Sequence, residues 1–162
     1  TPDMPHDRQH TYATRTEWTG NRGEGTTNYR TYARDHVITA AGRPDLLGSS
    51  DPAFRGDGSR WNPEDLLLAS LSSCHMLWYL HLCAQAGISV LAYHDDAVGT
   101  MVEDADGGGR YTQAVLRPVA TLAAGGDAAK AVALHDKAHR LCFIANSVSF
   151  PVLIEPTVLF AG

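Results

Sequence analysis

The spacing of hydrophobic and polar positions changes several times along this chain. Short runs of strand-like composition occupy residues 12–18, 26–32 and 36–40, and glycines separate them. Such runs are typical of strands in an antiparallel sheet. Residues 43–60 then become rich in Gly, Ser, Pro and Asp. This composition predicts a long loop, and loops of such length are often functional.

The next segment predicts a long helix that is apolar on nearly every side. Asn62 and Pro63 provide an N-cap residue and a proline at the first helical position, and two acidic residues follow in the first turn. We expect the helix to continue to about Ala86 and to end at Gly87. Polar residues interrupt the apolar stretch 66–86, so a buried core helix fits it better than a membrane span.

The second half of the chain predicts strands, a helix and a last strand. Residues 88–101 and 111–122 resemble two strands of a hairpin, joined by an acidic, glycine-rich turn. Asp127 is the expected N-cap of a second helix that ends near residues 142–146, and residues 151–160 form a closing strand. The order of strands, helix, strands, helix and strand indicates an α+β domain.

Length and composition predict one domain over residues 1–162, with residues 1–13 flexible. The 162 residues are 44% apolar, which is enough for a single core. The polar start of the chain offers little to bury. One small sheet can cover only one side of the long apolar helix, so we expect a second copy of the chain to cover the rest.

Charge and cysteine content narrow the function classes. The net charge of -5 gives no general attraction for nucleic acid or for an anionic membrane surface. No segment that joins basic residues to an apolar run begins the sequence, which argues against secretion. The three cysteines are widely spaced and form no CxxC pair. Reduced thiols in a cytoplasm are therefore expected.

The first predicted helix carries two of these thiols on different sides. At 100° per residue, Cys74 shares a face with Leu71, Leu77 and Trp78, whereas Cys83 points to the opposite side. The two thiols therefore cannot pair with each other. Taken alone, each also fits a small buried core residue.

A cluster in the second predicted helix leaves a metal site open as an alternative. His135, His139 and Cys142 are spaced so that their side chains can approach one ion from a single helix. The segment HDKAH is similar to the HExxH motif of metal-dependent hydrolases, with Asp in place of Glu. No acidic third ligand stands out, and a core thiol remains an equally simple explanation of Cys142.

Two longer motifs point to a known family. The first is NPEDLLLASLSSC, residues 62–74, in which the cysteine follows the glutamate by ten positions. The second is AHRLCFIANSV, residues 138–148, with Ala-His, then Cys, then Asn four residues later. On these motifs the chain resembles the OsmC/Ohr superfamily of peroxide-reducing proteins, over about residues 14–160.

The resemblance assigns roles to individual residues. It implies that Cys74 is the peroxidatic thiol, that Cys142 is the resolving thiol, and that Glu64 holds an active-site arginine. In this family the arginine comes from the N-terminal sheet. The segment ARDHVI is similar to the family's Arg-Asp turn, so Arg34 is the first choice and Arg30 the second.

The resemblance also implies a fold, a reaction and partners. The expected fold is α+β, with antiparallel sheets packed around a long central helix in an intertwined homodimer. The expected reaction reduces organic hydroperoxides, and hydrogen peroxide as a second substrate, without a cofactor. An external dithiol, either a small molecule or a lipoyl- or thioredoxin-type protein, would reduce the Cys74–Cys142 disulfide.

The residue types suit this chemistry. A thiolate is the attacking species, and an arginine nearby favours it by Coulomb attraction. The apolar Leu71, Leu77 and Trp78 would favour a hydroperoxide that has a tail to bury. The chain departs from the family pattern at three positions, with Phe143 in place of a common proline, His75 after the first cysteine, and the additional Cys83, which leaves substrate preference open.

One more alternative keeps the fold and changes the function. A member of this fold can also bind a small apolar ligand without catalysis, or serve as a redox sensor. In a sensor, oxidation of Cys74 is a signal, so peroxide consumption stops after one equivalent.

Overall fold

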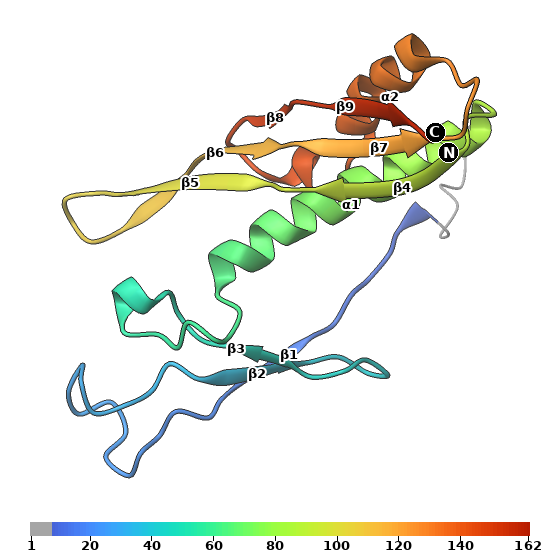
Figure 1. The fold of residues 1–162 in the computed structure, drawn as a ribbon. Helices are drawn as coiled ribbons and strands as arrows, with labels where there is room; N and C mark the ends of the chain where they lie inside the picture. The colour runs from blue at the N-terminus through green and yellow to red at the C-terminus, as the bar shows by residue number, and fades with distance from the viewer. Residues whose placement is uncertain (1–7) are drawn as a thin grey trace, which may run out of the picture. The chain divides into compact units, whose positions relative to one another are not determined.

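The computed structural model describes residues 8–162, which form two compact units that divide between Pro63 and Glu64. The first unit is a three-stranded antiparallel sheet in the order β1-β2-β3, with β1 Arg15–Trp18, β2 His36–Thr39 and β3 Leu46–Gly48 (Figure 1). The strands predicted at residues 12–18 and 36–40 therefore form, although both are shorter than expected.

Two predictions for the first unit are wrong. Residues 26–32 form turns and bends, because side chains there bond to the nearby backbone: Asn28 Oδ1 accepts from Arg30 N at 2.9 Å, and Thr31 Oγ1 donates to Asn28 O at 2.9 Å. Such local bonds compete with strand pairing. Residues 43–60 are not all loop, since they contain β3 and the 3-10 helix η2 Pro52–Phe54.

The second unit is built on α1 Pro63–Gln85, whose two ends follow the sequence signals. At its C-terminus Ile88 N donates to Cys83 O at 2.9 Å and Gly87 N to Ala84 O at 3.2 Å. Gly87 adopts a φ of 73°, the left-handed conformation that this helix ending requires. By length and composition alone α1 could cross a membrane, but its buried residues pack into the core of the unit.

Six strands form the layer on which α1 packs. They are β4 Val90–Asp95, β5 Val98–Glu103, β6 Gly109–Leu116, β7 Pro118–Leu122, β8 Val152–Ile154 and β9 Thr157–Phe160. They pair in two sheets, ordered β4-β7-β9 and β5-β6-β8 (Figure 1). The turn predicted between two strands joins β5 and β6, which are antiparallel.

Each of the three long strands predicted for this unit is divided in two. Pro118 and Pro156 lie at two of the breaks, where a missing N–H cannot join the strand pairing. At the third break Asp95 Oδ1 accepts from Arg117 N at 2.6 Å, and Asp95 Oδ2 accepts from Ser72 Oγ at 2.6 Å. The Asp95 carboxylate therefore links Arg117, which lies between β6 and β7, to Ser72 of α1.

The α+β prediction is confirmed, but the sheets are not wholly antiparallel. The closing strands β8 and β9 pair in parallel with β6 and β7. They can do so because α2 Ala128–Leu141 intervenes and returns the chain to the same end of the layer (Figure 1). Asp127 caps α2 as predicted, accepting from Lys130 N at 3.0 Å.

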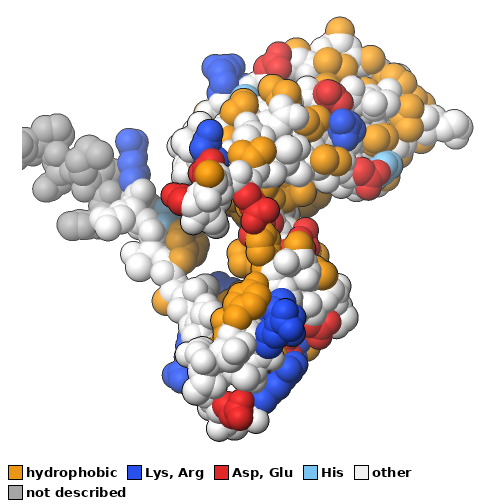
Figure 2. All heavy atoms as spheres, turned by 90° about the vertical axis from the view of Figure 1, so that its left-hand side faces the viewer, with side chains coloured by type: hydrophobic (Ala, Val, Ile, Leu, Met, Phe, Trp, Pro, Cys, Tyr) orange, Lys and Arg blue, Asp and Glu red, His pale blue; other side chains and the backbone are white. Residues whose placement is uncertain are grey.

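Hydrophobic residues remain on the surface of the second unit, as the upper part of Figure 2 shows. Leu77 of α1 and Leu91 of β4 are each 60% exposed, and Phe143 is 68% exposed. Most of the surface of these three side chains is therefore open to solvent in the described chain. The expected homodimer is not part of the structure.

Candidate active site

Cys74 lies in the middle of α1, at the edge of the buried face of that helix. Leu71 and the adjacent His75 are buried, whereas Cys74 itself is partly exposed. The packing of its neighbours therefore fixes the thiol in place and leaves it accessible from one side.

Cys142 is the residue that ends α2. Its backbone is extended, with φ -65° and ψ 114°, and its N–H donates to His139 O. Its side chain is 1% exposed. The sulfur accepts a hydrogen bond from Ala145 N at 3.4 Å and another from Ile144 N. The short helix η3 Ala145–Ser147 thus forms directly around this sulfur.

The structure brings the thiols of Cys74 and Cys142 close enough for the Cys74 thiol to raise the pKa of Cys142, although the two residues are far apart in the sequence. Both are reduced. Burial, with a smaller effect from the Cys74 thiol, raises the pKa of Cys142 to about 11. Cys142 is therefore a protonated thiol at neutral pH, which makes it the weaker candidate for the attacking nucleophile.

A pair of buried histidines joins the two helices that carry the thiols at Cys74 and Cys142. His75 Nε2 and His135 Nδ1 are 2.9 Å apart, and each side chain is 1% exposed. The His135 ring stacks on Tyr79 with a centroid distance of 3.7 Å. Burial lowers the pKa of His75 to about 4 and that of His135 to about 3, so both rings are neutral at pH 7. A neutral pair shares one hydrogen bond, in which one ring donates and the other accepts.

Sequence reasoning missed this pair. The sequence marked His75 only as a departure from the family pattern, and it placed His135 in the alternative metal site. The two are 60 positions apart, and no local pattern predicts that they meet.

A shallow apolar pocket of about 190 Å³ follows the exposed side of α1. Leu77, Trp78 and His81 line it. The Phe143 ring packs edge-on against Trp78 at 5.5 Å, and the His81 ring does so at 5.9 Å. Leu77 and Trp78 are one turn beyond Cys74, and Phe143 directly follows Cys142. The pocket therefore lies close to both thiols.

The third residue predicted to bind substrate, Leu71, does not fit that role. It is fully buried, and it packs with Ala114, Leu116 and Val152 in a core cluster. A ligand would have to displace the core to reach it. Leu71 shares a helix face with Cys74, as predicted, but strands β6 and β8 cover that end of the face.

The predicted arginine and its acidic partner belong to different units. Arg34 Nη1 and Nη2 donate to Tyr32 O and Tyr29 O, each at 2.7 Å, and the guanidinium lies over both tyrosine rings. Glu64 lies in the first turn of α1. The second choice, Arg30, lies on an exposed turn. A pairing of Glu64 with either arginine stays a prediction.

The arrangement gives the metal-site alternative no support. His135 points to His75 and is stacked on Tyr79, and Cys142 points to Cys74. Within residues 8–162, no three His, Cys, Asp or Glu side chains are grouped so that they could hold a metal ion.

Cys83 is a core residue of the second unit. It is 1% exposed and packs with Tyr79, Leu82 and Ile88. Burial raises the pKa of its thiol. It faces away from Cys74, as the helix geometry predicts.

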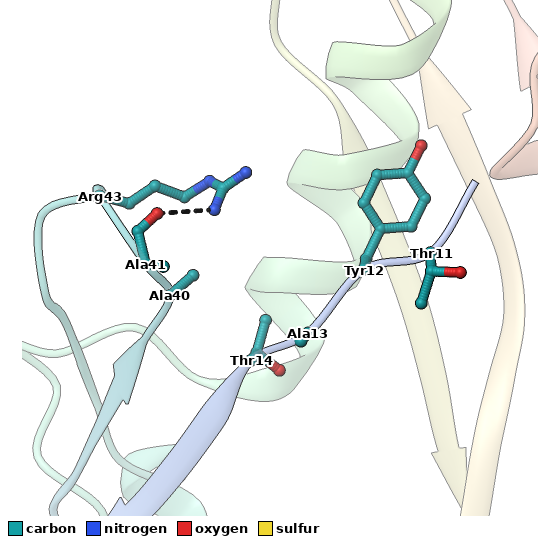
Figure 3. Close-up of a pocket in the computed structure, with 7 residues that line it drawn as sticks. All are labelled: Thr11, Tyr12, Ala13, Thr14, Ala40, Ala41 and Arg43. Carbon is teal, nitrogen blue, oxygen red and sulfur yellow. Dashed lines mark hydrogen bonds between the residues drawn. The ribbon is translucent and has the colours of Figure 1, made fainter.

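A further hollow of about 360 Å³ lies in the first unit, between the segment that precedes β1 and the turn that follows β2 (Figure 3). Arg43 is the one charged residue among those that line it, and its Nη1 donates to Ala41 O at 3.1 Å. No thiol, imidazole or carboxylate is part of its lining.

Comparisons with known proteins agree with the motifs. The profile of the OsmC-like protein family matches residues 56–157. An OsmC-like protein of unknown function from Vibrio cholerae has a similar structure, with a TM-score of 0.83 and 30% identity over 91% of this chain and 99% of that one. Among curated proteins, none matches this sequence.

More distant structures share the fold. An organic hydroperoxide resistance protein from Legionella pneumophila has a TM-score of 0.66 at 20% identity, covering 93% of this chain and 99% of that one. Another from Elizabethkingia anophelis has a TM-score of 0.66 at 19% identity, covering 94% and 99%.

Proposed function

Because this chain belongs to the OsmC family, we propose that it is a thiol-dependent peroxidase that reduces organic hydroperoxides. The observation that carries the proposal is the contact between the thiols of Cys74 and Cys142. The names of the Legionella pneumophila and Elizabethkingia anophelis structures add support for hydroperoxides as the substrate class.

Cys74 is the proposed peroxidatic residue. Its thiolate attacks the terminal oxygen of the hydroperoxide, the O–O bond breaks, and the alkoxide leaves as an alcohol after taking a proton. Cys74 is then a sulfenic acid. Its partial exposure and the protonated state of Cys142 both support this division of roles.

Cys142 is the proposed resolving residue. Its sulfur attacks the sulfur of the sulfenic acid, a disulfide forms, and the hydroxyl group leaves as water with the proton of the Cys142 thiol. An external dithiol then returns both cysteines to thiols and itself becomes a disulfide. A reducing cytoplasm, which keeps such dithiols available, suits this cycle.

Arg34 and Glu64 complete the proposed machinery. An arginine near Cys74 would favour the thiolate, and its planar group can donate hydrogen bonds to peroxide oxygens. A carboxylate holds a guanidinium well through two parallel hydrogen bonds. The bonds to Tyr29 O and Tyr32 O use two of the five N–H groups of the Arg34 guanidinium, which leaves three donors for the proposed bonds to a carboxylate and the substrate.

The pocket beside Trp78 is the proposed site for the organic part of the substrate. Leu77, Trp78 and Phe143 offer apolar and aromatic surface within one or two helical turns of the thiols. Burial of an alkyl or aryl tail there would stabilise the enzyme–substrate complex by about 25 cal/mol per Å² of apolar surface. Hydrogen peroxide has no tail and cannot make this contribution.

We also propose a homodimer. Half or more of the side-chain surface is exposed for Leu77, Leu91 and Phe143, in a unit whose long helix is apolar on most sides. A second copy of the chain would bury part of this surface, including Leu91, and could complete the wall of the pocket beside Trp78.

The test is hydroperoxide consumption by the purified protein with excess dithiothreitol. We expect repeated turnover of cumene hydroperoxide, at a rate well above that for hydrogen peroxide. Cys74→Ser should abolish consumption, whereas Cys142→Ser should form no intramolecular disulfide and turn over more slowly, because dithiothreitol must then reduce the Cys74 sulfenic acid directly. Cys83→Ala is the matched control and should retain turnover. Consumption by the native protein that ends after one equivalent would favour the redox-sensor alternative.

A further inference from the structure

Helices α1 and α2 are linked inside the core by two hydrogen bonds from α1 side chains. One joins His75 Nε2 and His135 Nδ1 at 2.9 Å, and the other runs from Tyr79 Oη to Ala131 O at 3.0 Å. Both links lie among apolar side chains of the second unit, including Leu82, Ala120 and Leu122. The histidine link joins two side chains, whereas the Tyr79 link joins a side chain to a backbone carbonyl.

The histidine pair is connected by rigid backbone to both thiols. His75 directly follows Cys74, and His135 precedes Cys142 by seven residues, which is about two helical turns. A shift of α2 along α1 would move Cys142 with it. The distance between the thiols therefore depends on where His135 sits against His75.

We propose that His75 and His135 are positioning residues, whose hydrogen bond fixes α2 against α1 so that the Cys142 thiol meets Cys74. The inference rests on the proposed function, because it gives the pair a purpose in closing the Cys74–Cys142 disulfide. Neither histidine touches the substrate or exchanges a proton with it.

A hydrogen bond can set this register, whereas apolar packing alone cannot. Hydrophobic contact is non-directional, so two apolar helices can slide with little change in buried area. A slide by one residue moves a side chain by about 1.5 Å, which breaks a bond of 2.9 Å. Two buried imidazole nitrogens would then lack partners, at a cost of about 1–3 kcal/mol for each group.

The ring stacking adds to the fixed geometry. His135 lies parallel to Tyr79 at an interplanar angle of 7°, and parallel to His75 at the same angle. Tyr79 is itself held by its bond to Ala131 O. The His135 ring can therefore neither rotate nor withdraw without disturbing two other contacts.

Disulfide closure can be measured without any hydroperoxide. Diamide takes up the two electrons and two protons that are released when two thiols become a disulfide. After one equivalent of diamide, peptide mapping and thiol titration over time give the rate at which the Cys74–Cys142 bond forms. Circular dichroism of each variant reports whether the fold is retained.

Two variants of His75 separate the hydrogen bond from the packing. In His75→Gln the amide nitrogen can take the place of imidazole Nε2, whereas His75→Leu keeps apolar volume and removes the bond. We expect closure in His75→Leu to slow by about tenfold to a hundredfold, as a displacement of about 1 Å can cause. His75→Gln should close within about threefold of the native rate.

The matched control is His94→Leu, the same replacement at an exposed histidine of β4. It should close at the native rate. His135→Asn, which retains a nitrogen near the position of Nδ1, provides a second test if His75→Leu does not fold, and should also close near the native rate.

Several results would overturn the inference. Closure at the native rate in folded His75→Leu would do so, and so would equal slowing in His75→Leu and His75→Gln. A native protein that consumes no hydroperoxide but shows the expected order of closure rates would refute the proposed function and support the positioning role.

Discussion

At the scale of the residue, two neighbours on α1 have opposite environments. Cys74 is partly exposed and meets a second thiol, while His75 is buried and meets a second imidazole. The helix turns by 100° per residue, so adjacent positions face different surroundings. Cys74 can therefore take part in the proposed reaction while the next residue, His75, takes part in the proposed positioning of α2.

The histidine pair makes stability depend on pH. In the folded state the pKa is lowered to about 4 for His75 and about 3 for His135, mainly by burial, with a smaller effect of His139 on His75 that Asp95 partly offsets. An unfolded histidine titrates near 6.5. Between pH 6.5 and about 4 the unfolded chain binds more protons, so stability falls as the pH falls through this window.

Urea denaturation at pH 7 and at pH 4.5 measures this effect. We expect the free energy of unfolding to be lower at pH 4.5 by on the order of 5 kcal/mol, about half of it from each histidine. The double variant His75→Gln, His135→Asn cannot titrate at these positions and should lose most of the difference. An equally large difference in that variant would assign the effect to other groups.

At the scale of the element, α2 carries His135 and ends at Cys142, so its own stability matters to the site. Asp127 accepts from Lys130 N and caps the helix. Asp127→Ala should lower the free energy of unfolding by about 1 kcal/mol, because the first turn then has an unpaired N–H. Asp136→Ala, an exposed acid on the same helix, should change it by less than about 0.5 kcal/mol.

Helix ends were predictable because their signals are local. Pro63 starts α1, Gly87 follows its end, and Asp127 starts α2, and each acts on backbone groups within four residues. The strand break at residues 96–97 was not predictable in the same way. It depends on Asp95 reaching both Ser72 and Arg117, which requires the folded arrangement.

Local motifs likewise predicted part of the candidate site, whereas the rest depends on contacts between residues far apart in the sequence. Family motifs supplied Cys74 and Cys142, and the structure brings these two together. The same motifs gave no information on the His75–His135 bond, because it joins residues 60 positions apart. Leu71 was assigned to the substrate pocket from helix geometry alone, which does not reveal that strands cover it.

At the scale of the whole molecule, the exposed apolar residues of the second unit predict self-association. We expect light scattering to give about twice the 17.5 kDa chain mass, because a second copy would cover part of this apolar surface, including Leu91. A mass equal to one chain at micromolar concentration would contradict the homodimer.

Because Cys142 ends α2 rather than lying within it, its sulfur lies against the turn that follows the helix. Ile144 and Ala145 donate their N–H groups to that sulfur. If Cys142 resolves the sulfenic acid as proposed, disulfide formation would alter these two hydrogen bonds, so the backbone of this turn would report the redox state of the site.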